Sequence, residues 1–146
     1  MYDPTVLRLK THEECEQYAK NVEVKHPELA KQARRRGVEL RAAKYGATTD
    51  AERDALQAIY AFEEIRSQEA GKRVRASRTW QSIQRHGILP TVEGVVTRRA
   101  ATEAYGALVE AGMEDFTFEA VVLRHREAFS PEAIAQSEAR LQEREA

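Results

Sequence analysis

The segment from Thr49 to Gly71 constrains the fold of this chain most, because it has the start, the periodicity and the end of a helix. Thr49 and Glu52 have the spacing of a capping box, which satisfies free amide groups at a helix start. Glycine at position 71 suits a helix end. Between them, apolar residues recur at steps of three and four, as on one helical face: Ala55, Leu56, Ile59, Phe62 and Ile65. We predict a helix packed on a core, with Glu63 and Glu64 facing solvent.

Similar start and end signals divide the rest of the chain. They predict helices near 11–24, 27–45, 77–86, 91–99, 102–111, 115–123 and 130–142. Ala, Glu, Arg and Leu dominate the composition, and these residues favour helices. We therefore expect an all-α, compact domain of about seven or eight short to medium helices. Residues 1–10 are expected to be an arm, with a short extended stretch at 6–9. Lobes at 11–71 and 77–142 would be joined by a basic linker at 72–76.

Three of these helices carry specific packing expectations. The segment from Phe116 to Leu123 is apolar nearly all round and should lie in the core, with Asp115 as its cap. The helix at 130–142 begins with a strong Ser-Pro start but has few apolar residues, so it should lie on the surface or on a partner. The helix at 27–45 should turn one face inward: Leu29, Ala33, Leu40 and Ala43.

Charge is distributed very unevenly along the second half of the chain. Residues 72–99, called here the basic segment, hold seven Lys or Arg and one acid, Glu93. Residues 100–146, the acidic segment, hold ten acids and four Arg, so a net +6 is followed by a net −6. Opposite blocks of this kind indicate an anionic partner, a self-complementary assembly or internal neutralisation.

Two short helices in the basic segment, 78–86 and 91–99, meet at a tight turn over Gly87-Ile88-Leu89-Pro90, which resembles the arrangement of a helix-turn-helix motif. In that motif the second helix enters the major groove of DNA. Here the turn is one residue short, Pro90 stiffens it, and the second helix has few side chains for base edges. The sequence therefore favours phosphate contact over base recognition. The candidate contact residues include two from a basic run in the 27–45 helix: Arg73, Arg75, Arg78, Arg98, Arg99, Arg34 and Arg35.

Signals for catalysis, metal binding or a cofactor are weak. The single cysteine, Cys15, lies between two glutamates, which disfavour a reactive thiolate. Glu23 and His26 match half of a di-metal carboxylate motif, and the second half is missing. There is no glycine-rich phosphate loop and no nucleophile signature. We therefore expect no catalytic, metal or cofactor residues, although an active site assembled in space stays open. Trp80, at helical spacing from Ile83, is interpreted as a core anchor.

These observations favour a non-enzymatic binding protein with an arginine-rich face for an anionic partner, with nucleic acid backbone as the first choice. The alternative is a protein–protein interaction module, such as a homodimer in which basic and acidic segments pair between copies. The basic segment could also simply neutralise the acidic one. No apolar run approaches a membrane span, the N-terminus does not resemble a signal peptide, and one cysteine fits a reducing compartment, so we expect a cytoplasmic protein.

Overall fold

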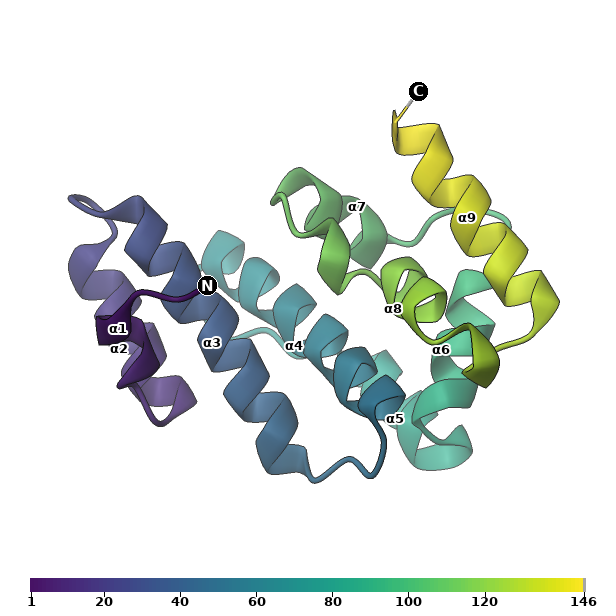
Figure 1. Cartoon of the computed structure of the whole chain (residues 1–146), viewed down its shortest axis with the longest axis horizontal. Coiled ribbons are helices and arrows are strands. Elements are labelled where there is room, and N and C mark those ends of the chain that lie inside the picture. Colours follow the sequence, from purple (N-terminus) through teal and green to yellow (C-terminus); the bar gives the residue numbers. More distant parts are fainter. Residues whose placement is uncertain (146) are drawn as a thin grey trace. The chain divides into compact units, whose positions relative to one another are not determined.

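Helix-capping residues set most of the element boundaries in the computed structural model, which describes residues 1–145 and side chains up to Glu143. Within this range the chain is all-α, with nine helices, two 3-10 turns and no strand (Figure 1). The predicted fold class is confirmed. The chain divides into two compact units, Met1–Ala47 and Thr48–Ala146. The boundary between the units lies just before Thr49, which caps the helix Asp50–Ala70. The sequence instead suggested a division into two lobes at the basic linker, 72–76.

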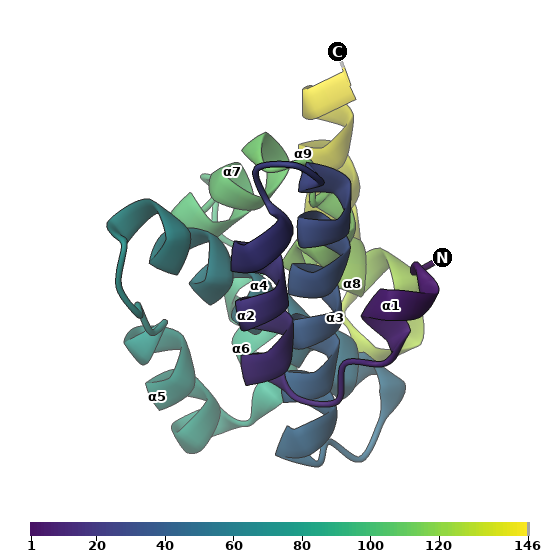
Figure 2. The ribbon, with the colours of Figure 1, turned by 90° about the vertical axis from the view of Figure 1, so that its left-hand side faces the viewer.

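The first unit contains α1 (Pro4–Leu7), α2 (His12–Val22) and α3 (Pro27–Tyr45), and Figure 2 shows α1 and α2 beside α3. Thr11 caps α2 by accepting a hydrogen bond from the Glu14 amide at 3.1 Å. Residues 1–10 do not form an extended arm. Asp3 caps α1, and Val6 is fully buried because this short helix packs against α3.

Small residues allow α2 and α3 to pack closely. Ala19, Ala30 and Ala33 form a buried cluster between them. A Cβ atom added at Gly37 would lie 3.2 Å from the His12 Cδ2 atom and 3.3 Å from the Cys15 Cβ atom, so any larger residue at this crossing would require α2 to shift by a few tenths of an ångström. The buried face of α3 differs from the face predicted from the sequence. Of the four residues predicted to face inward, only Ala33 is buried, whereas Leu29 and Leu40 are half-buried and Ala43 is exposed. The buried positions of this helix are Ala30, Ala33, Gly37, Val38 and Ala42.

The second unit contains α4 (Asp50–Ala70), α5 (Ser77–His86), α6 (Ile88–Val96), α7 (Glu103–Glu110), α8 (Phe118–Arg124) and α9 (Pro131–Glu145). The 3-10 turns η1 (Glu114–Phe116) and η2 (Arg126–Ala128) flank α8. As predicted, Thr49 caps α4 and Gly71 ends it in the left-handed conformation. Four helices contribute to the main apolar cluster: Ala55, Ala58, Val92, Val96, Val121, Val122 and Ala133.

Two predictions about the C-terminal helices need correction. Thr117, and not Asp115, caps α8, since its hydroxyl oxygen accepts from the Ala120 amide at 3.1 Å. The last helix, α9, is not a surface helix: it packs on α8 and α6 through buried positions that are mostly small or polar. These positions are Ala133, Ser137 and Arg140. Among the residues described, no helix combines the length and the apolar character needed to cross a membrane.

Candidate nucleic-acid interface

Side chains of α4 hold the linker that precedes α5. The Ser67 hydroxyl group accepts a hydrogen bond from the Val74 amide at 2.8 Å, and the Glu63 carboxylate accepts one from the Ala76 amide at 2.8 Å. Val74 and Ala76 are consequently half-buried, and Arg75 between them is exposed. The alternation of inward and outward residues turns the linker arginines toward solvent.

Glu63 is the anchor of this region, and its burial corrects the prediction of a solvated face. Only 2 % of its surface is exposed. In addition to the Ala76 amide, its Oε2 atom accepts a hydrogen bond from the Trp80 indole Nε1–H at 2.7 Å. A buried carboxylate is tolerated when hydrogen-bond donors of this kind surround it. Glu63 thus fixes both the linker and the first turn of α5 to α4.

Trp80 is the aromatic centre of the same region. Its ring packs at a centroid distance of 5.2 Å from Tyr60, and the Arg75 guanidinium carbon lies 5.8 Å from the Trp80 ring centroid. A guanidinium group over an indole face is favoured by cation–π attraction. Trp80 is half-buried, so it both anchors α5 and orients an exposed arginine.

The turn between α5 and α6 consists of Gly87 alone, with a φ of +93° that favours glycine. The Thr91 hydroxyl group donates to the Gly87 carbonyl at 2.8 Å and is also bonded to the Ser82 hydroxyl at 2.8 Å. The helix resumes at Ile88, earlier than the predicted start near Thr91. Because α6 packs against α4, α5, α8 and α9, it is not a free second helix of the helix-turn-helix kind.

The turn after α6 carries two more arginines, Arg98 and Arg99, and a buried cation supports it from α9. The Arg140 guanidinium group donates to the carbonyl oxygens of Val96 at 3.4 Å and of Arg98 at 2.6 Å, and it pairs with Glu119 at 2.6 Å. Its side chain is 3 % exposed. Both exposed arginines therefore project from a fixed turn.

The one acid of the basic segment, Glu93, forms no ion pair with a described arginine and is bonded to the start of α9 instead. The Glu93 carboxylate accepts hydrogen bonds from the Ser130 amide at 3.1 Å and from its hydroxyl group at 2.5 Å. Ser130 in turn caps α9 by accepting from the Ala133 amide at 3.0 Å. Glu93 is thus used to join α6 to the start of α9.

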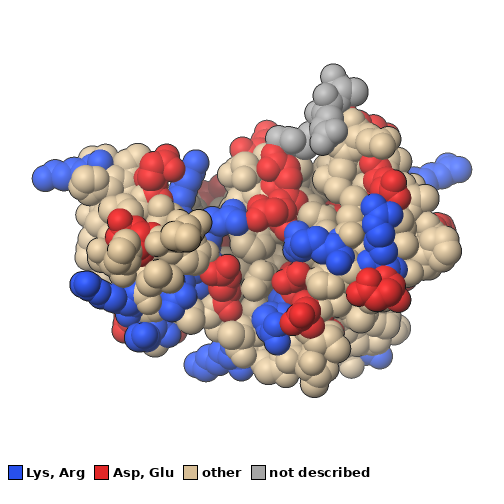
Figure 3. Space-filling model, in the orientation of Figure 1, with Lys and Arg blue, Asp and Glu red and all other residues tan. Residues whose placement is uncertain are grey.

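Arginines inside and outside the basic segment differ in their partners. Elsewhere in the second unit, each arginine whose side chain is described forms an ion pair with an acid: Arg53, Arg66, Arg124, Arg126 and Arg140. Within the basic segment, five exposed arginines form no ion pair with any described side chain: Arg75, Arg78, Arg85, Arg98 and Arg99. Direct ion pairing with the acidic segment, one of the expected alternatives, is not found for these five. Over the face of the molecule shown in Figure 3, Lys and Arg side chains are intermixed with Asp and Glu side chains.

Arg34 and Arg35, the other two candidates, lie on α3 in the first unit. Arg34 forms an ion pair with Glu23 at 2.7 Å, and its side chain is 20 % exposed. Arg35 is half-buried and interacts with Tyr2. Burial and the neighbouring Glu39 carboxylate raise the pKa of the Tyr2 hydroxyl group, which donates a hydrogen bond to Glu39 at 2.7 Å. Both arginines therefore already have partners within their own unit.

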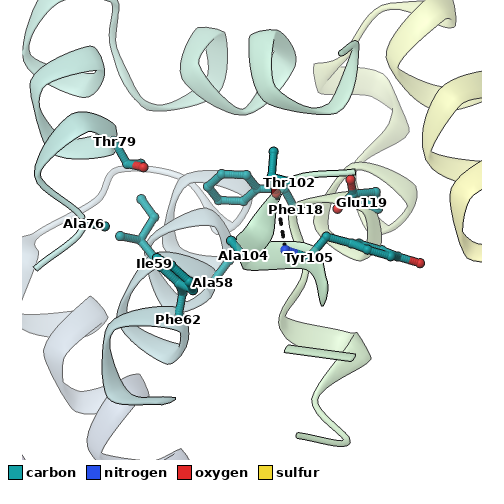
Figure 4. A pocket seen from close by; sticks show the side chains of 10 residues that line it. All are labelled: Ala58, Ile59, Phe62, Ala76, Thr79, Thr102, Ala104, Tyr105, Phe118 and Glu119. Carbon is teal, nitrogen blue, oxygen red and sulfur yellow. Dashed lines mark hydrogen bonds between the residues drawn. The ribbon is translucent and has the colours of Figure 1, made fainter. Parts of the chain in front are cut away.

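An apolar hollow in the second unit lies between α4 and the start of α5 on one side and α7 and α8 on the other (Figure 4). Its volume is about 50 Å³. Small-molecule sites measure roughly 300–1,000 Å³, so the hollow admits a few atoms at most. Its buried carboxylate, Glu119, is already paired with Arg140. The hollow is a packing feature and not a substrate site.

Cys15, the single cysteine, is 1 % exposed. Burial raises the pKa of its thiol to about 11, which suppresses the reactive thiolate. Sequence reasoning identified the arginines of the basic segment but missed the residues that position them, namely Glu63, Ser67 and Arg140. No protein-family model, curated protein or solved structure matches this chain.

Proposed function

We propose that this protein binds the phosphate backbone of nucleic acid through the unpaired arginines of its basic segment. One observation carries the proposal: described arginines elsewhere in the second unit have acidic partners, and five exposed arginines of this segment have none. Arg75, Arg78 and Arg85 lie on α5 and the linker before it, where neighbouring like charges repel one another and an external anion relieves that repulsion. A guanidinium group also matches a phosphate through two parallel hydrogen bonds.

The way two parts of the surface are held supports the same proposal. Trp80 and Glu63 hold Arg75 and the linker, and Arg140 holds the turn that carries Arg98 and Arg99. Side chains that project from fixed backbone lose less freedom on binding, which favours affinity. Arg34 and Arg35 have partners within their own unit, so we leave them out of the proposed surface.

The test is a fluorescence-anisotropy titration with labelled duplex DNA, single-stranded DNA and RNA at about 50 and 200 mM salt. Each phosphate contact contributes about 0.9 to the slope of log affinity against log salt for duplex DNA. The Arg75→Ala/Arg78→Ala variant is expected to bind more weakly and to flatten that slope by about two.

A matched control separates a contact surface from a mere change in net charge. Arg53→Ala/Arg126→Ala removes two exposed arginines from the same unit, both already paired with acids. This control variant should leave the salt slope nearly unchanged and should lower the affinity only slightly, because the net charge of the protein falls by two. Equal losses in the two double variants would contradict a localised surface. Absence of binding to all three nucleic acids at 50 mM salt would remove the proposal altogether.

A homodimer is the second candidate, and one observation favours it. Several exposed glutamates of the acidic segment form no ion pair with a described side chain: Glu110, Glu127 and Glu132. They could meet the unpaired arginines of a second copy in a two-fold arrangement. Sedimentation of the wild type and of Arg75→Ala/Arg78→Ala without nucleic acid separates the two candidates. Self-association that the substitution weakens would favour the dimer.

A further inference from the structure

The outward face of α5 has a composition that phosphate binding alone does not require. Six of its positions are exposed, and all but His86 at its C-terminal end recur at helical spacing over roughly a third of the helix circumference: Ser77, Arg78, Gln81, Gln84 and Arg85. Neither glutamine has a hydrogen-bond partner among the described residues. The chain also has no acid between Glu69 and Glu93, so this face carries no negative side chain.

Cations lie on both sides of the two glutamines. By helical geometry, Arg78 and Arg85 follow one side of the face. Trp80 follows the other side, with the Arg75 guanidinium group over its ring. A helix in the major groove of DNA has a phosphate strand on each side and base edges in front of it.

We infer that α5 enters the major groove of duplex DNA, with Gln81 and Gln84 contacting base edges between flanking arginines. This inference rests on the proposed function and names its partner class. The helix has ten residues, so it is about 15 Å long, and a helix of ordinary width fits the groove, which is about 12 Å wide. A glutamine amide can donate to N7 and accept from N6 of adenine, and is therefore suited to base recognition.

The structure favours α5 over α6 and duplex DNA over other nucleic acids. Four helices pack around α6, whereas α6 is the main packing partner of α5. RNA duplexes have a deep, narrow major groove that side chains do not reach. Proteins that bind single strands stack bases on exposed aromatic rings, and the outward face of α5 has none.

The experiment selects binding sites for the full-length protein from a random pool of about 20-base-pair duplexes. Affinity is then measured for an enriched duplex and for a scrambled duplex of the same composition. Wild type should prefer the enriched duplex. Gln81→Ala/Gln84→Ala should reduce that preference by about fivefold or more per lost contact, with no change in the salt slope. Gln142→Ala, an exposed glutamine on α9, is the matched control and should keep the preference.

Each outcome bears on a different claim. Binding without enrichment, or a preference unchanged by the double substitution, would overturn the groove assignment and leave phosphate binding intact. Equal or tighter binding to single-stranded DNA or RNA would overturn it in the same way. No binding to any probe would overturn the proposed function and this inference together. A normal melting curve for the double variant ensures that a lost preference reflects recognition and not unfolding.

Discussion

Replacing Arg140 with Met should strongly destabilise the second unit. The guanidinium group is almost completely buried and has three acceptors: the Glu119 carboxylate and the carbonyl oxygens of Val96 and Arg98. Methionine fills similar space without a charge, so Glu119, 2 % exposed at its side chain, would be left without its cation. Breaking a buried pair from one side costs about 3–5 kcal/mol. That is a large fraction of the roughly 5–15 kcal/mol that stabilises a domain.

Urea unfolding followed by Trp80 fluorescence provides the assay, because Trp80 is the only tryptophan and lies in the second unit. With a slope of about 1.5 kcal/mol per molar urea, the midpoint should fall by about 2–3 M. Replacing both Glu119 and Arg140 with Met should recover much of the loss, since no isolated charge remains buried. A loss below about 1 kcal/mol for Arg140→Met would refute the reasoning. A double variant as unstable as the sum of the two single variants would refute it as well.

Three further predictions concern two glycines within helices and the buried thiol. Gly94 in α6 has open space around it, so Gly94→Ala should raise stability by about 0.5–1 kcal/mol through helix propensity. Gly37→Ala should instead lower the melting temperature, since its Cβ atom would lie 3.2 Å from His12 Cδ2 and 3.3 Å from Cys15 Cβ, and we expect the cost of displacing α2 to exceed the gain in helix propensity. A rise for this variant would contradict the close packing described for α2 and α3. Because burial raises the pKa of the Cys15 thiol to about 11, the thiol should react with a disulfide reagent at pH 8 only after urea unfolding. Rapid modification of the folded protein would show that this thiol is accessible.

Local sequence signals predicted the helices well where capping residues are explicit. The signals at Thr49 and Gly71, and at Pro27 and Gly46, placed the ends of α4 and α3 correctly. These features depend on residues within one turn of each other, so the sequence alone contains them. The same is true of the acid-free stretch between Glu69 and Glu93, from which Arg75, Arg78 and Arg85 project.

Buried charged residues could not be predicted in this way. Glu63 looks like a surface residue because it lies beside the apolar stripe of α4, and its burial depends on donors 13 and 17 residues further along the chain. Glu119 and Arg140 are 21 residues apart and become partners only when α8 and α9 pack. For the candidate site, the arginines could therefore be predicted, and the groups that orient them could not.

The emission of Trp80 during a titration with duplex DNA tests the central claim most directly. The Arg75 guanidinium group lies 5.8 Å from the Trp80 ring centroid, so a phosphate bound at Arg75 must change the surroundings of this single tryptophan. We predict a saturable emission change with the same Kd as the anisotropy titration, reversed by salt and lost in Arg75→Ala/Arg78→Ala. Binding that leaves Trp80 emission unchanged, or an emission change that persists in the double variant, would contradict a site at α5 and its linker.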